Sequence, residues 1–179
     1  ERLTGLSYYE YVRRNIYQKA NMSNSDHYAK DDPKIAHGYI QTDQGWQDNY
    51  ADLGRIGSPA GGGYASANDL MNFAQALYAN QLLDVAAREE MLSAKVSLGP
   101  PGFDYAYGFG VHNEEGILYI GHNGGAPGIN AEFSYFPQLG YTLIVLSNYG
   151  RAASPLAKQA RQWLIHSQAA DELRKNSTH

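Results

Sequence analysis

Residues 117–148 read ILYIGHNGGAPGINAEFSYFPQLGYTLIVLSN, and the predicted architecture follows from this stretch and the residues just before it. Four segments rich in apolar, aromatic and β-branched residues have the length of strands: Tyr105–Asn113, Ile117–Gly121, Ala131–Phe136 and Tyr141–Ser147. The turns NEEG (113–116) and PQLG (137–140) are too short for a crossover, so they join antiparallel neighbours. We therefore predict an antiparallel β-meander.

Helices are predicted before the meander. Two stretches, 7–10 and 66–69, have the Ser-x-x-acid spacing of a capping box, in which each side chain satisfies a free N–H at a helix start. Apolar residues at helical spacing then predict helices at three places: 7–19, 68–79 and 85–93. Residues 20–63 have no sustained period, which predicts an irregular excursion.

A last helix is predicted after the meander. Ser154 is expected to cap it, and Pro155 to occupy its first position. Its expected apolar face consists of Leu156, Ala160, Trp163 and Leu164. The resulting α+β organisation has a helical and irregular region at 1–104, the sheet and its helix at 105–167, and a frayed tail at 168–179.

Composition excludes several classes of protein. The chain has 179 residues, 43% of them hydrophobic, which is enough for a real core. A net charge of −4 without a basic stripe argues against nucleic acid as a partner. There is no cysteine, and no apolar run approaches the ~20 residues of a membrane span. The chain opens without Met, so we expect it to come from the interior of a longer protein.

The segment GHNGG (121–125) is the candidate site, because it places a histidine among glycines at the end of a predicted strand. Glycines leave the backbone open to a ligand, and free N–H groups there can hold a developing oxyanion. The imidazole of His122 can exchange a proton near neutral pH. The local pattern leaves a second interpretation open: a wide turn at 124–128 beside a partly exposed strand histidine.

The remaining histidines do not predict a metal site. They stand apart, without the paired spacing of metal ligands: His27, His37, His112, His166 and His179. The glycine-rich run GGGYAS (61–66) precedes a helix but lacks the lysine of a phosphate-binding loop. We expect neither a metal nor a cofactor.

Four segments, in the correct order, resemble the superfamily of serine β-lactamases, penicillin-binding proteins and esterases, in its class C-like branch. They are GLSYYEYVRRNIYQKANM (5–22), PAGGGYASANDLMNFAQAL (59–77), YGFGV (107–111) and GHNGGAPGINAEFSYFPQLGYTLIVLSN (121–148). The resemblance implies part of a β-lactamase/transpeptidase-like fold. It also implies an enzyme that hydrolyses esters, D-amino-acid amides or β-lactams through an acyl-enzyme.

The resemblance assigns roles to the candidate site. His122-Asn123-Gly124 stands at the third motif of the family, on a strand that lines one wall of the active site. By this resemblance, Gly125 supplies one oxyanion-hole N–H, and His122 places or protonates the substrate side of the tetrahedral intermediate. Asn123 and Gly124 would contact the substrate. The His-type motif is similar to that of esterases and peptidases acting on D-residues.

Two family motifs are missing from the chain. No lysine has a serine three residues before it, so the Ser-x-x-Lys nucleophile is absent. The only Tyr-x-Asn, at 78–80, closes a predicted helix in the wrong segment and is read as a coincidence. The chain thus resembles the C-terminal half of such an enzyme, and we expect it to be inactive alone.

Further expectations follow from the resemblance. The intact protein would act on a small-molecule ester, amide or β-lactam in the periplasm or outside the cell. The strand 141–147 would be an apolar edge, through which the chain could associate with itself. Two alternatives stay open: a non-catalytic relative that binds a peptide or glycan, and an unrelated α+β interaction module.

Overall fold

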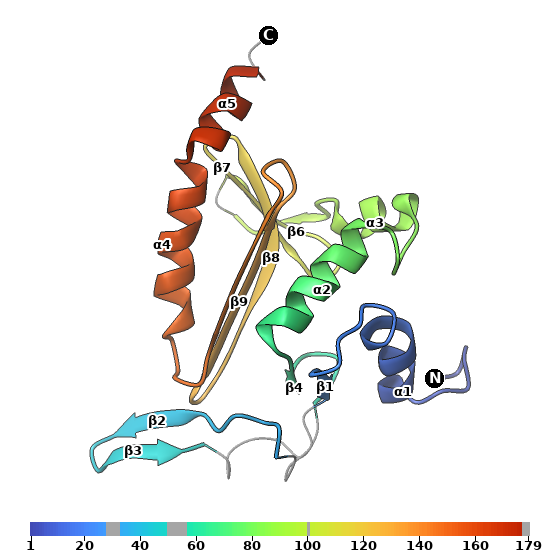
Figure 1. Ribbon diagram of the computed structural model, residues 1–179, viewed down its shortest axis with the longest axis vertical. Helices are drawn as coiled ribbons and strands as arrows, with labels where there is room; N and C mark the ends of the chain where they lie inside the picture. Colours follow the sequence, from blue (N-terminus) through green and yellow to red (C-terminus); the bar gives the residue numbers. More distant parts are fainter. Residues whose placement is uncertain (28–32, 50–56, 100, 177–179) are drawn as a thin grey trace. The chain divides into compact units, whose positions relative to one another are not determined.

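The structure is a computed structural model that describes residues 1–27, 33–49, 57–99 and 101–176 (Figure 1). The chain divides into two compact units, Glu1–Arg88 and Glu89–His179, and each is described by itself. Parts of the stretch predicted to be irregular, and the end of the tail, lie outside the described residues. Among the described residues, none of the helices has the length and apolar character that a membrane crossing requires.

The second unit is built on a six-stranded antiparallel sheet, with the order β10-β9-β8-β7-β6-β5 (Figure 1). Its strands are β5 (Val96–Ser97), β6 (Phe103–Tyr105), β7 (Gly110–Glu114), β8 (Ile117–Ala126), β9 (Ile129–Phe136) and β10 (Tyr141–Ser147). Each strand pairs with its sequence neighbour, so the predicted meander and the α+β class are confirmed.

The predicted strand Tyr105–Asn113 is wrong, because the chain reverses direction within it. Ala106 N–H donates to Phe109 O at 2.8 Å, and Gly108 takes a φ of +82° that favours glycine. A tight turn therefore separates β6 from β7. The surrounding aromatic residues resemble a continuous strand, and Gly108 alone marks the reversal.

Helix α4 (Ala153–Ile165) packs on one face of the sheet, against β9 and β10 (Figure 1). It begins one residue before its predicted cap. Ala152 holds the N-cap position without a side-chain hydrogen bond, so the assignment of Ser154 as the cap is wrong. The Ser154 hydroxyl turns instead to the sheet, where it donates to Glu132 Oε1 at 2.7 Å.

The predicted apolar face of α4 is also wrong in part. Leu156 is 65% exposed and Trp163 is 69% exposed, whereas the fully buried residues are Ala153, Ala157 and Ile165. The reason lies in the sheet. Beneath the helix β9 presents a polar row, Asn130, Glu132 and Ser134, so small alanines let the helix approach while its larger side chains turn outward.

The apolar core of the second unit extends into the chain's last helix. Ile117, Phe136, Ile165 and Ala170 are completely buried in one cluster. Ala170 belongs to α5 (Gln168–Asn176). The expectation of a frayed tail from residue 168 is therefore wrong as far as residue 176.

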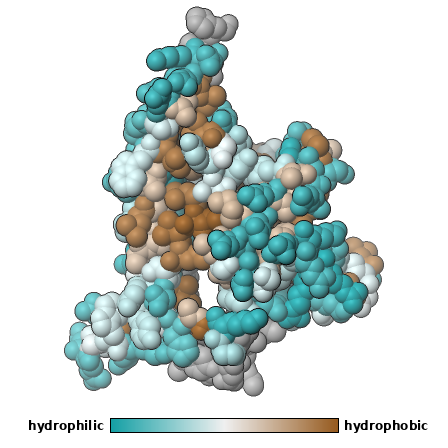
Figure 2. All heavy atoms as spheres, in the orientation of Figure 1, coloured by the Kyte–Doolittle hydropathy of each residue, from teal (hydrophilic) through white to brown (hydrophobic). Residues whose placement is uncertain are grey.

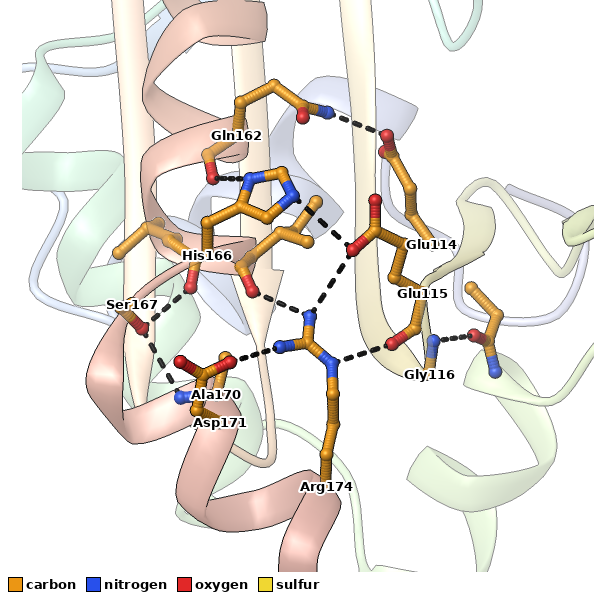
Figure 3. Close-up of polar contacts among 12 residues, drawn as sticks. Glu114, Glu115, Gly116, Gln162, His166, Ser167, Ala170, Asp171 and Arg174 are labelled. Carbon is orange, nitrogen blue, oxygen red and sulfur yellow. Dashed lines mark hydrogen bonds and ion pairs between the residues drawn. The ribbon is translucent and has the colours of Figure 1, made fainter.

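Arg174 ties α5 to the turn between β7 and β8 (Figure 3). Its Nε donates to Glu115 O at 2.9 Å, and its Nη2 donates to Ile165 O at 2.7 Å. Its Nη1 pairs with Asp171 at 2.9 Å. His166 Nε2 lies 3.3 Å from the Glu115 carboxylate in the same cluster. Glu115 lies 59 residues from Arg174 in the sequence, so no local pattern could reveal their contact.

The first unit combines short helices with two small strand pairs. Its elements are α1 (Tyr8–Val12), the π-helical turn η1 (Arg13–Tyr17), β1 (Asp26–His27), β2 (Tyr39–Thr42), β3 (Gly45–Asp48), β4 (Gly63–Tyr64) and α2 (Ala67–Tyr78). Strand β1 pairs with β4, and β2 pairs with β3. Helix α3 (Val85–Leu92) spans the division between the units.

Only one of the two hydrogen bonds of the predicted capping box forms at the start of α2. Ser66 Oγ accepts the N–H of Asp69 at 3.1 Å, as expected. The Asp69 carboxylate does not return to Ser66. It is buried, and it accepts the Asn24 N–H at 2.6 Å and the Ser25 hydroxyl at 2.7 Å. The acid thus ties the segment after η1 to α2.

Replacing Arg174 by methionine is expected to loosen α5. The change removes three donated hydrogen bonds and leaves the Ile165 carbonyl without this partner, so we expect a loss of about 1 kcal/mol in the free energy of unfolding. Amide hydrogen exchange in 168–176 should accelerate. Lys158→Met on α4 is the matched control, and equal exchange in the two variants would contradict the assignment.

Stability is expected to fall with acidification through His112. Its ring is stacked between Phe103 and Tyr119, each at 4.5 Å, and desolvation, with the nearby Arg161 charge, lowers its pKa. The unfolded chain therefore binds the proton more readily, and stability present above about pH 6.5 is lost below it. Urea titrations of His112→Phe should show a smaller loss of stability on acidification than the wild type, and an undiminished loss would refute this origin.

Candidate active site

The candidate segment lies in the hairpin of β8 and β9. The sequence predicts a strand that ends at Gly121, but β8 continues to Ala126, and its register with β9 is unbroken from Ile120 to the turn. Only Pro127 and Gly128 connect the strands, with a φ of +74° at the glycine. The alternative of a wide turn at 124–128 is therefore wrong.

Close contact between the two strands requires glycine at the start of this segment. A Cβ placed on Gly121 would lie 2.0 Å from Phe133 O. A Cβ on Gly124 would have nothing within 4 Å, and one on Gly125 would meet only Ile129 O at 3.8 Å. The hairpin is thus tightly packed at Gly121 and open at the two later glycines.

One edge of β8 is unpaired beyond Gly121. Strand β7 begins at Gly110, which lies opposite Gly121, so residues 122–126 pair with β9 alone within the described chain. All five residues are exposed. A ligand can therefore approach this stretch of backbone from the side that β7 leaves free.

The direction of each amide along β8 follows from strand alternation. Leu118 N–H donates to Gln138 Oε1 at 2.9 Å, just beyond the end of β9. Successive residues of an antiparallel strand point their N–H and C=O groups to opposite edges. Even-numbered residues of β8 thus direct these groups to β9, whereas Asn123 and Gly125 direct theirs to the open edge.

The ring of His122 has a defined partner at each nitrogen. Nδ1 lies 2.6 Å from Asn123 O, and Nε2 lies 2.9 Å from the hydroxyl of Tyr105 in β6. Because a carbonyl can only accept, Nδ1 carries the proton. In the neutral ring, Nε2 then accepts the hydrogen bond of the Tyr105 hydroxyl. The ring is therefore held in one tautomer at an exposed edge.

The structure brings all four sequence-predicted site residues onto this edge: His122, Asn123, Gly124 and Gly125. It adds Tyr105, which the sequence reading missed because tyrosine is abundant and β6 lies two strands away. The hydrogen bonds of His122 within the described chain reach neither a serine nor a lysine. The described residues also hold no cluster of three potential metal ligands.

Comparisons with known proteins identify relatives. The beta-lactamase family matches residues 1–168. Penicillin-binding protein 4* of Bacillus subtilis (strain 168) is 27% identical over 166 residues, which covers 83% of this chain and 36% of that protein. The crystal structure of a penicillin-binding protein from Bacillus halodurans is 28% identical, with a TM-score of 0.84, over 90% of this chain and 51% of that chain.

A further solved structure shares the fold at lower identity. D-amino acid amidase from Ochrobactrum anthropi SV3, complexed with L-phenylalanine, is 20% identical, with a TM-score of 0.72, over 97% of this chain and 53% of that one. The chain therefore spans between 36% and 53% of the length of these three proteins.

The tautomer of His122 can be measured in this chain. Long-range ¹H–¹⁵N correlation spectra of the neutral ring are expected to show the proton on Nδ1, because Asn123 O accepts it and the Tyr105 hydroxyl occupies Nε2. Tyr105→Phe removes the second partner and should shift the population toward the Nε2–H form, while Tyr107→Phe serves as control. A wild-type ring protonated mainly at Nε2 would overturn this geometry.

Proposed function

This chain belongs to the beta-lactamase family, and from that premise we propose that it is one part of a serine hydrolase that works through an acyl-enzyme. The proposed substrates are small esters, amides of D-amino acids, or β-lactams. The observation that carries the proposal is the open edge of β8, along which His122 and Gly125 are both exposed and the Gly125 N–H points away from β9.

In the proposed reaction, Gly125 supplies one hydrogen bond to the oxyanion. A serine oxygen attacks the substrate carbonyl carbon, its proton passes to a base that is proposed to lie with the serine outside these 179 residues, and the π electrons of the carbonyl move to its oxygen. A backbone N–H that already points to the open edge stabilises this charge without reorganisation. Asn123 and Gly124 would contact the rest of the substrate, since they lie exposed on the same segment.

His122 is proposed to serve the leaving group. When the tetrahedral intermediate collapses, the expelled alcohol or amine needs a proton, and an imidazole at the strand edge can relay one. Tyr105 supports this role because its hydroxyl lies at Nε2, the nitrogen that does not face Asn123 O. Water then attacks the acyl-enzyme and releases the acid.

The attacking serine is proposed to lie outside these 179 residues. The sequence contains no Ser-x-x-Lys, and its Tyr78-Ala79-Asn80 falls at the end of α2 and in the residues just after it. The chain spans about half or less of the relatives it matches, which leaves room in a longer protein for both motifs. We therefore propose that this chain supplies one wall of the site and is inactive alone.

Labelling with a fluorophosphonate tests this assignment. In the full-length gene product, the probe should modify a serine outside residues 1–179, located by peptide mass spectrometry. The isolated chain should stay unlabelled and should hydrolyse neither p-nitrophenyl acetate nor nitrocefin above background. Saturable turnover by the chain that is lost in His122→Ala would contradict the proposal. A full-length protein without Ser-x-x-Lys would favour a peptide- or glycan-binding relative.

The outer strand β10 is proposed as a second functional surface, through which the isolated chain associates with another copy. It pairs only with β9 among the described strands, and none of its residues is fully buried. Tyr141 is 48% exposed and Leu146 is 39% exposed. Hydrophobic side chains gather over the sheet beside α4 in Figure 2. An apolar strand edge of this kind recruits another strand.

Light scattering of the concentrated chain should therefore detect a dimer or larger species. Leu146→Lys places a charge on the edge strand and should shift the population toward monomer. Leu156→Lys, at an exposed site on α4, controls for added charge. A monodisperse monomer at high concentration, or equal effects of the two changes, would exclude association through β10.

A further inference from the structure

The peptide that joins Gly124 to Gly125 belongs to the β8–β9 pairing and also receives a hydrogen bond from one side chain of the neighbouring strand. Asn130 Nδ2 donates to Gly124 O at 3.1 Å, and Asn130 is only 7% exposed on the buried face of β9. The N–H and C=O of a planar trans peptide point in opposite directions. A carbonyl held toward β9 therefore aims the Gly125 N–H at the open edge.

Contacts around the Cα atoms of Gly124 and Gly125 do not restrict the orientation of this peptide. Gly124 has no neighbour within 4 Å of its Cβ position, and Gly125 has one backbone atom at 3.8 Å. Glycine also has the widest range of backbone angles of any residue. Strand pairing with Ala131 already directs the Gly124 carbonyl to β9, and the Asn130 amide adds a second restraint on this peptide, which two glycines flank.

The orientation of the Asn130 amide is itself determined by α4. Its Oδ1 accepts the backbone N–H of Ser154 at 2.9 Å, in the first turn of the helix. The Ser154 N–H can only donate and the Gly124 carbonyl can only accept. The oxygen must therefore face the helix and the nitrogen must face β8, since a flipped amide would lose both hydrogen bonds.

A buried charge pair holds the helix and the strand in this arrangement. The Ser154 hydroxyl donates to Glu132 Oε1 at 2.7 Å, and Glu132 Oε2 accepts from Arg161 Nη1 at 3.1 Å. Glu132 is 5% exposed, so breaking its pairing would leave an uncompensated charge in the interior. The start of α4 is thereby kept opposite Asn130.

We propose that Asn130 is a positioning residue, which reinforces the direction that strand pairing gives to the Gly125 N–H, the proposed oxyanion donor, and connects that group to α4. The catalytic consequence rests on the proposed function. The orientation of the peptide is a property of this chain alone and can be tested without activity.

The first experiment is NMR spectroscopy of the 179-residue chain. A scalar coupling across the hydrogen bond should join Asn130 Nδ2 to the Gly124 carbonyl carbon. Asn130→Asp keeps an acceptor for Ser154 but removes the donor, so the Gly125 N–H residual dipolar coupling should change. Ser134→Ala, on the same buried face of β9, should leave that coupling unaltered. No scalar coupling in the wild type, or an unchanged Gly125 coupling in Asn130→Asp, overturns the proposal, and the wild-type measurement decides it even if the variant does not fold.

The second experiment is steady-state kinetics of the full-length gene product with an ester substrate. Asn130→Asp should lower kcat about tenfold to a hundredfold, with KM changed less than about threefold, because the restrained N–H acts in the transition state. Ser134→Ala should retain kcat. Unchanged kcat in a folded Asn130→Asp overturns the catalytic role. A wild-type protein without hydrolysis refutes the proposed function instead, and the NMR result then still decides the positioning of the peptide.

Discussion

The pairing of β8 with β9 is the constraint on which the rest of the second unit depends. Its register, with Gly124 opposite Ala131, sends alternate backbone groups to the sheet and to the free edge. The same register turns the polar row of β9 toward α4. A slip of one residue would reverse both outcomes, because it moves every side chain to the other face. Strand pairing therefore sets the open edge and the closed face together.

The sequence was sufficient for the fold class and for most elements with a strong local signal. The meander, α2 and the turn at 137–140 follow from periodicity and turn chemistry. The errors occur where tertiary contacts override local pattern. Trp163 is read as core by helical spacing, yet it faces outward because β9 presents charge to the helix. Helix α5 packs on the core through Ala170, and Arg174 ties it to a turn 59 residues away, so no local window contains both partners of that contact.

The residues of the candidate site also fall into those that a local sequence pattern reveals and those that only tertiary contacts reveal. His122 and the glycines after it are adjacent in sequence, so a local reading and a family resemblance can both find them. Tyr105 and Asn130 could not be found in this way, because each becomes relevant only when the strands pair. A tyrosine in a tyrosine-rich chain and an asparagine near a turn carry no distinctive spacing. Their contributions depend on a hydrogen bond to a group elsewhere in the sheet.

The contrast among the glycines of β8 bears on how this hairpin can be redesigned. Gly121 admits no side chain, since β9 occupies the space that a Cβ would need. Gly124 stands in open space and has no positive φ, so its backbone accepts a Cβ, and hence L-residues other than proline, without steric conflict at that atom. A combinatorial library confined to position 124 would therefore vary the chemical character of the exposed edge while leaving the scaffold beneath it intact.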